Sequence, residues 1–307
     1  MRKLLKSPDI TKYLVAAILL AVPLYPKFPF IKVPGTFVSI RLEDFLLAVV
    51  SVIFVFRILP NVKKFLENKI NKAIFLSLSI GFLSLITAIF VTKTVEPHIG
   101  LLHWLRRIEY FVPFFVGFLV IKERKENLEF YLKVLMISVI LAFLYGLGQK
   151  YLNWPIIITQ NLEYAKGIAL RWVPGSHINS TFAGHYDLAT FLVMILPVYA
   201  CLFFLLKGWR TKMIIFTVFS AGLWLLGNSG SRISVVSYLG ALTIALILIK
   251  KYKAIPLVII LSLVFFSMSS SLMARYSRIF EVTGKKIFKI NSLFFKQEVV
   301  YAADEPI

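Results

Sequence analysis

Long apolar stretches alternate with short polar connections along most of the sequence. A helix needs about 20 residues to cross a hydrocarbon core about 30 Å thick, because each residue adds about 1.5 Å. On this scale the pattern predicts about nine membrane-spanning helices, and therefore an all-α, polytopic transmembrane bundle over residues 1–274. The predicted spans are 11–30, 42–60, 73–92, 108–121, 130–148, 184–206, 212–228, 232–249 and 254–273. Residues 275–307 are predicted to begin an extracytoplasmic loop.

The composition supports a membrane protein and argues against a nucleic-acid-binding one. Hydrophobic residues make up 59% of the 307 and charged residues only 16%, whereas soluble domains are about half apolar and about a quarter charged. The formal net charge is +20, but Lys and Arg lie in short clusters between apolar runs instead of forming one basic domain. Membrane lipids are therefore expected partners, and nucleic acid is not.

The distribution of Lys and Arg predicts the orientation, since these residues concentrate in the cytoplasmic connections of membrane proteins. If the N-terminus is cytoplasmic, the inner connections are richer in Lys and Arg than the outer ones at almost every hairpin. These inner residues include Lys63, Lys64, Lys122, Arg124, Lys250 and Lys251. An odd number of spans then places the C-terminus outside. We expect a multi-pass protein of the plasma (inner) membrane.

The two predicted faces differ in chemistry as well as in charge. Inner connections such as 250–253 are short and rich in lysine, as expected of simple membrane anchors. Outer connections are longer, and 149–183 combines Trp, His, Asn, Pro and Gly in a segment too apolar for a disordered linker. The chemistry of the protein is therefore expected on the outer side.

The most informative outer segment is the short turn 228–234, which contains Ser231 and Arg232. An arginine in mid-membrane costs about 2.5–3.5 kcal/mol, so one at a span end is expected to reach the interface or to hold an anion. Free backbone amides and hydroxyl groups at a helix N-terminus also favour negative charge. The turn therefore suits a phosphate group. An interfacial arginine beside a serine cap explains the same residues equally well.

Residues 171–189 lead into the predicted sixth span and supply candidate acid–base groups. His185 is a possible proton acceptor, since an imidazole titrates near neutral pH. Asp187 either orients that histidine or acts as the base itself. A structural alternative is that both residues cap the helix and pair with a neighbouring arginine. Arg171 and His177 are further candidate substrate contacts.

A third candidate is the pair Arg106-Arg107 near an outer helix start. Two adjacent arginines among aromatic residues suit a lipid head group or a pyrophosphate. Glu109 is expected to form a local ion pair with Arg106. Glu43 and Asp44 open the second span and are more simply explained as acidic partners of a helix N-terminus.

No metal ion or other cofactor is expected. The four histidines lack zinc-ligand spacing, and Cys201 is the single cysteine. A phosphate-binding loop of the nucleotide-binding kind does not occur. The spans also do not form two similar halves with broken helices, which would have indicated a secondary transporter.

Together these residues resemble the O-antigen ligase and polysaccharide polymerase family of membrane proteins. The resemblance covers nearly the whole chain and rests on three features. Ser231-Arg232 ends a short outer loop and opens an apolar helix, like the Ser-Arg-Gly motif of the family. Residues 180–189 lead to a helix that contains Pro197, and residues 41–44 resemble a recurrent start of the second span.

The resemblance implies a glycosyltransferase that acts outside the membrane without a metal or a nucleotide sugar. Such an enzyme moves a glycan from a polyprenyl-pyrophosphate carrier to a hydroxyl of a lipid or glycan acceptor. Arg232 would hold the donor pyrophosphate, where charge develops. His185 with Asp187 would take the acceptor proton. Arg171, Arg106, Arg107, Ser231 and His177 would contact the substrates.

The sequence departs from the family at Ile233, where glycine is usual, and at Asp187, where asparagine is common. The histidine and second arginine of the family lie on a large outer loop, which has barely begun at residue 307, so we expect the sequence to be the front part of a longer protein. Two other functions fit less well. A lipid-glycan flippase would need charges near mid-membrane, and a structural subunit would use its arginines only to hold lipid.

Overall fold

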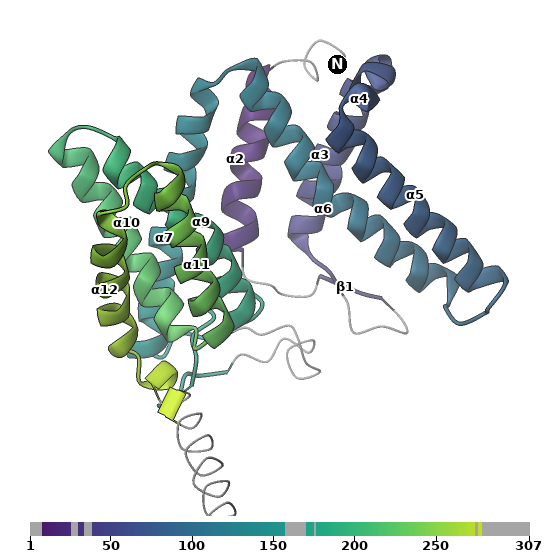
Figure 1. Ribbon diagram of the computed structural model, residues 1–307. Helices are drawn as coiled ribbons and strands as arrows, with labels where there is room; N and C mark the ends of the chain where they lie inside the picture. The colour runs from purple at the N-terminus through teal and green to yellow at the C-terminus, as the bar shows by residue number, and fades with distance from the viewer. Residues whose placement is uncertain are drawn as a thin grey trace, which may run out of the picture. The chain divides into compact units, whose positions relative to one another are not determined.

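The structure is a computed structural model that describes residues 8–25, 30–33, 39–156, 170–174, 176–273 and 276–277. It divides into two compact units (Figure 1). The first unit comprises the described residues up to Leu144, with Leu170 and 181–183. The second comprises 145–156, 171–180 and the described residues from Gly184 onward. Within the described residues the regular structure is helical apart from one two-residue β-ladder and the isolated bridge positions Ile156 and Leu170.

The first unit is built around helix α6. Its helices are α2 (Pro8–Leu24), α3 (Leu42–Ile58), α5 (Lys69–Phe90), α6 (Pro97–Glu123) and the first part of α7 (Glu126–Tyr151), with the short η1 (Leu59–Asn61) and α4 (Val62–Glu67). Helix α6 contacts α2, α3 and α5. Strands β1 (Ile31–Lys32) and β2 (Ser39–Ile40) pair antiparallel, with Ile31 opposite Ile40. The buried core of this unit includes Val15, Val50, Val112, Val116 and Val120.

The second unit packs the end of α7 with α9 (His185–Leu205), α10 (Trp209–Asn228), α11 (Arg232–Leu248) and α12 (Ala254–Ser267). Helix α9 contacts both α10 and α11, and α10 contacts α12. Gly222 allows α9 and α10 to approach closely, because a Cβ atom there would lie 2.5 Å from Cδ2 of Leu196. Small residues permit such approaches between apolar helices. The core includes the fully buried Leu188, Leu192, Leu223 and Tyr238.

The helices of the second unit run alternately up and down, so their connections fall at two opposite ends (Figure 1). The connections 206–208, which contains Lys207, and 249–253, which contains three lysines, lie at one end. The other end holds the start of α9 and the turn from α10 to α11. The end of α7 lies there too, because Lys150 is hydrogen-bonded to Asn228. Within this unit the candidate residues and the lysine anchors therefore occupy opposite ends, as the sequence predicts.

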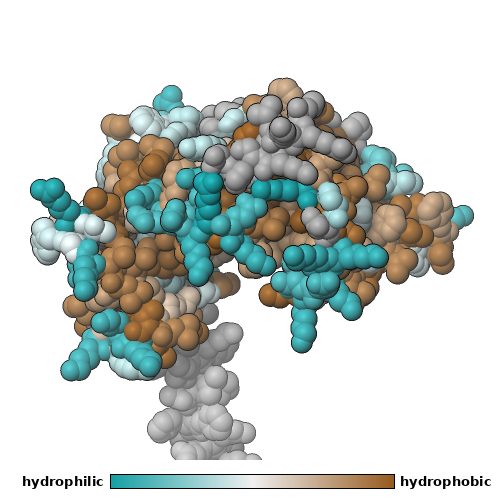
Figure 2. All heavy atoms as spheres, turned by 90° about the horizontal axis from the view of Figure 1, so that it is seen from above, coloured by the Kyte–Doolittle hydropathy of each residue, from teal (hydrophilic) through white to brown (hydrophobic). Residues whose placement is uncertain are grey.

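Four described helices are long and apolar enough to cross a membrane, namely α5, α7, α9 and α10. Apolar helices of 10–17 residues occur at 10–24, 232–248 and 254–267. Figure 2 shows the corresponding broad hydrophobic surface, with hydrophilic side chains gathered between apolar areas. A helical membrane protein is thus supported. The number of about nine spans and the orientation of the termini stay predictions, and the predicted loop 275–307 lies outside the described residues except for 276 and 277.

Several predicted boundaries need correction. The short span predicted at 108–121 is the second part of a helix of 27 residues that begins at Pro97, a residue well suited to the first helical turn. Arg106 and Arg107 interrupt the apolar run but continue the helix, because arginine has a high helix propensity. The helix in the predicted span 11–30 ends at Leu24. The helix in 254–273 is interrupted after Ser267, and helical residues resume at 270–273.

Candidate functional site

The turn between α10 and α11 is a compact, serine-rich helix start. Gly230 has a φ of 67°, which a residue without Cβ adopts easily. Ser231 is the N-cap of α11: its Oγ accepts a hydrogen bond from the backbone N of Ser234 at 3.4 Å and lies 2.7 Å from Oγ of Ser234. Ser231 is buried, whereas Arg232 is exposed. The serine hydroxyl is therefore occupied by the cap, and the arginine is the group presented outward.

Helices α9 and α11 are neighbours that run in the same direction and begin at the same end of the second unit. Their N-termini carry His185, in the first turn of α9, and Arg232, in the first turn of α11. Asp187 is exposed, also in the first turn of α9. Because each helix N-terminus carries a partial positive charge, two of them at one end reinforce the attraction of this end for an anion.

The structure brings the two candidate histidines together. The ring centroids of His177 and His185 are 3.8 Å apart, and the ring of Tyr186 lies 4.0 Å from that of His185. His177 comes from the loop before α9 and His185 from the helix itself. The loop and the helix start therefore form one aromatic, titratable cluster.

A buried glutamine holds the histidine loop in place. Gln149 of α7 is fully buried; its Nε2 donates to the carbonyl O of Ser180 at 2.9 Å, and its Oε1 accepts from the N of Ser180 at 2.9 Å. Nε2 also lies 3.2 Å from the carbonyl O of Pro155. In addition, the backbone N of Ile178 donates to the carbonyl O of Asn228 at 2.9 Å. The loop is thus attached to α7 and to the last residue of α10.

Lys150 is a site residue that the sequence did not single out. Its Nζ donates to Oδ1 of Asn228 at 2.8 Å and lies 5.4 Å from the ring centroid of Trp224 and 5.6 Å from that of Tyr151. Asn228 is itself oriented, since its Nδ2 donates to the carbonyl O of Trp224 at 2.8 Å. Lys150 therefore supplies a half-buried positive charge that is bound to Asn228, three residues before the Ser231 cap. In the sequence, the polar pair 149–150 at the end of an apolar helix could have indicated this residue.

Each of the remaining candidates has its own surroundings. Arg171 is exposed, in a segment where Nε1 of Trp172 donates to the carbonyl O of Ser176 at 3.1 Å. Arg106 and Arg107 belong to the first unit, and their side chains diverge. Nη2 of Arg106 lies 3.3 Å from Oδ2 of Asp44 in α3, whereas Nη1 of Arg107 lies beside Gly81 of α5.

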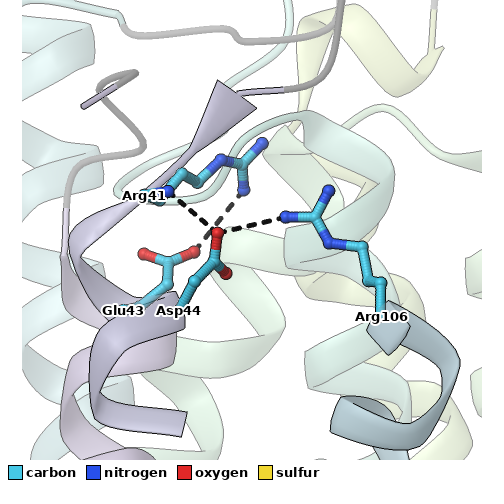
Figure 3. A network of polar contacts seen from close by, with 4 residues as sticks. All are labelled: Arg41, Glu43, Asp44 and Arg106. Carbon is cyan, nitrogen blue, oxygen red and sulfur yellow. Dashed lines mark hydrogen bonds and ion pairs between the residues drawn. The ribbon is translucent and has the colours of Figure 1, made fainter. Parts of the chain in front are cut away.

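The cluster around Asp44 differs from the expected local pairing (Figure 3). Arg106 pairs with Asp44 of another helix, so the predicted ion pair with Glu109 is wrong. An acid that follows its basic partner along a helix is in the less favourable order, which weakens such a local pair. Asp44 also accepts a hydrogen bond from the backbone N of Arg41 at 2.8 Å, and Nη1 of Arg41 lies 3.5 Å from Glu43. Asp44 therefore serves both as a helix-start partner and as a link between α3 and α6.

Among the described residues no group of three or more His, Cys, Asp or Glu side chains is arranged to hold a metal ion. No family model, curated protein or solved structure matches this chain.

Proposed function

We propose that the protein is a membrane glycosyltransferase of the O-antigen ligase-like kind. It moves a glycan from a polyprenyl-pyrophosphate carrier to an acceptor hydroxyl on the non-cytoplasmic side of the inner membrane. The proposal rests most on one observation: a single end of the second unit combines the exposed Arg232 with the His177–His185 cluster, away from the lysine-rich connections.

In this proposal, Arg232 binds the donor pyrophosphate at the N-terminus of α11. The bond between the sugar carbon and the pyrophosphate oxygen breaks, and the leaving pyrophosphate takes up the electron pair. A fixed guanidinium stabilises this charge, since it needs no reorganisation during the reaction. The partial positive charge at the N-terminus of α11 and the charge of Lys150 also stabilise the negative charge of the pyrophosphate.

The acceptor hydroxyl must lose its proton as its oxygen attacks the sugar carbon. His185 is the proposed base, with Asp187 as the group that orients it or replaces it. His177 stacks beside His185 and contacts the substrates together with Arg171. Arg106 and Arg107 lie in the first unit, and Arg106 is already paired with Asp44. We therefore assign pyrophosphate binding chiefly to Arg232.

The proposal is tested by glycan transfer with the purified, full-length protein in detergent. We expect glycosylated acceptor to form from a polyprenyl-pyrophosphate-linked glycan without added metal or nucleotide sugar. A flippase moves its substrate between leaflets and makes no new bond, so it would give no product in detergent. Absence of product from a folded protein that moves lipid-linked glycan across vesicles would contradict the proposal and support a flippase.

Replacing Lys150 with methionine is expected to raise the KM for the donor about tenfold, with a smaller change in kcat. The reason is that one charge-assisted contribution to anion binding is lost, which corresponds to about 1.5 kcal/mol or more. Steady-state kinetics with varied donor concentration measure this effect. The matched control is Lys251→Met, which removes an exposed lysine at the opposite end of the second unit. A KM equal to that of the control would rule out a role for Lys150 in donor binding.

A further inference from the structure

The first unit contains a cavity of about 450 Å³. Its walls come from α3 and α6, with Val33 and Ile40. Most of the lining is apolar and includes Phe45, Val52, Leu102 and Leu105. This volume lies within the range of small-molecule sites, about 300–1,000 Å³. These four side chains are exposed, so the cavity is an open groove that can accept an apolar chain.

Polar groups gather on one part of the lining. Asp44, Arg106 and Glu109 line the cavity. His103, about one turn before Arg106 in α6, lines it as well. Arg106 is held by Asp44 at 3.3 Å, and Arg41 lies 3.5 Å from Glu43 (Figure 3). Both guanidinium groups of this cluster thus have acidic partners. An anionic head group would have to displace a carboxylate from an arginine, so an anion is disfavoured here.

Glu109 changes the charge balance of the cluster. Among the described residues it adds a third carboxyl group to those of Glu43 and Asp44, beside the two guanidinium groups of Arg41 and Arg106. Glu109 is partly buried and receives no hydrogen bond from any described residue. A partly buried carboxylate is stabilised by a donor with positive charge. The cavity therefore combines an apolar pocket with a polar group that favours a cation.

We propose that this cavity binds an amphiphile with one apolar chain and an ammonium head group. The chain lies between α3 and α6, and the ammonium donates hydrogen bonds to Glu109 and to Asp44. A neutral alcohol of the same chain length binds less tightly, because it lacks the charge that matches the third carboxylate. The proposal does not rest on glycan transfer, since Glu109 and Asp44 have no proposed role in that reaction.

The test uses tetradecylamine as the probe and the full-length protein released from detergent micelles in native mass spectrometry. We expect one saturable molecule of tetradecylamine per chain, and retention of tetradecanol that is at least tenfold weaker. Glu109→Gln keeps the size of the side chain but removes its charge, and is expected to weaken tetradecylamine retention about tenfold. Glu129→Gln is the control, since Glu129 is an exposed residue of α7 paired with Lys133 at 2.7 Å.

A second variant tests the cavity without changing any charge. Ala48 lines the cavity, so Ala48→Phe fills part of it and is expected to reduce tetradecylamine retention at unchanged net charge. Equal retention of tetradecanol and tetradecylamine would overturn the assignment of an ammonium ligand. Retention that neither Glu109→Gln nor Ala48→Phe reduces would overturn the site itself.

Discussion

Arg232→Ala in the full-length protein is expected to lower glycan transfer by about 100-fold or more. Arg232 is exposed in the first turn of α11, directly after the buried Ser231 cap. Loss of one preorganised group that stabilises developing negative charge typically costs a factor of about 10²–10³ in rate. The measurement is transfer of glycan from the polyprenyl-pyrophosphate donor, in cells and with purified protein. Normal glycan attachment would refute the role of this arginine.

Lys250→Ala is the matched control, because Lys250 is an exposed basic residue at the opposite end of the same helix. We expect this variant to keep almost full activity.

The side of the membrane on which Arg232 lies can be tested by labelling a cysteine at position 232. Cys201 is the single cysteine, so Arg232→Cys in a Cys201→Ser background gives one reactive thiol. Labelling of intact cells by an impermeant maleimide is expected, and labelling only after permeabilisation would place the site on the wrong side.

Gln149→Leu is expected to destabilise the second unit by about 2–6 kcal/mol. The substitution removes both hydrogen bonds between the Gln149 side chain and the backbone of Ser180, and loss of a partner at a buried polar group costs about 1–3 kcal/mol. Ser180 also has a φ of 52°, so its loop depends on this support to keep an unfavourable conformation. Thermal unfolding in detergent and the rate of protease cleavage within 170–184 measure the effect.

Thr217→Val is the control for this experiment. Thr217 is an exposed residue of α10 whose hydroxyl donates to the carbonyl O of Met213 in its own helix at 3.0 Å. Its loss removes a hydrogen bond without leaving a buried group unsatisfied, so stability should change by less than about 1 kcal/mol. If Gln149→Leu and Thr217→Val have the same stability, the buried glutamine does not hold the loop.

The sequence predicted the helices of the second unit well. The predicted spans 184–206 and 232–249 correspond closely to His185–Leu205 and Arg232–Leu248. Each of these apolar runs begins after a polar turn, so hydropathy marks both the helix and its start. Prediction was poorer where a helix continues through polar residues. Helix α7 starts at Glu126 and α5 at Lys69, because charged residues near a membrane surface extend a helix without extending its apolar run.

The candidate site was predictable in its residue types but not in its contacts. Arg232 and Ser231 follow from a short motif, and the structure confirms the serine cap that was one interpretation of it. The contact between Lys150 and Asn228 joins residues far apart in the sequence, and so does the pair of Arg106 and Asp44. Such pairs depend on which helices pack together and on how far each is shifted along its axis relative to its neighbour. Neither property is encoded in the periodicity of a single helix.

The last residue of α10 has a consequence for how the site can move. Asn228 accepts hydrogen bonds through its side chain from Lys150 and through its carbonyl from Ile178, one residue after His177. The turn that leads to Arg232 starts at this same residue. A ligand that draws the turn outward must therefore pull on the histidine loop and on the end of α7 as well. We therefore expect the guanidinium of Arg232 and the imidazole of His177 to shift together when a ligand binds at either one.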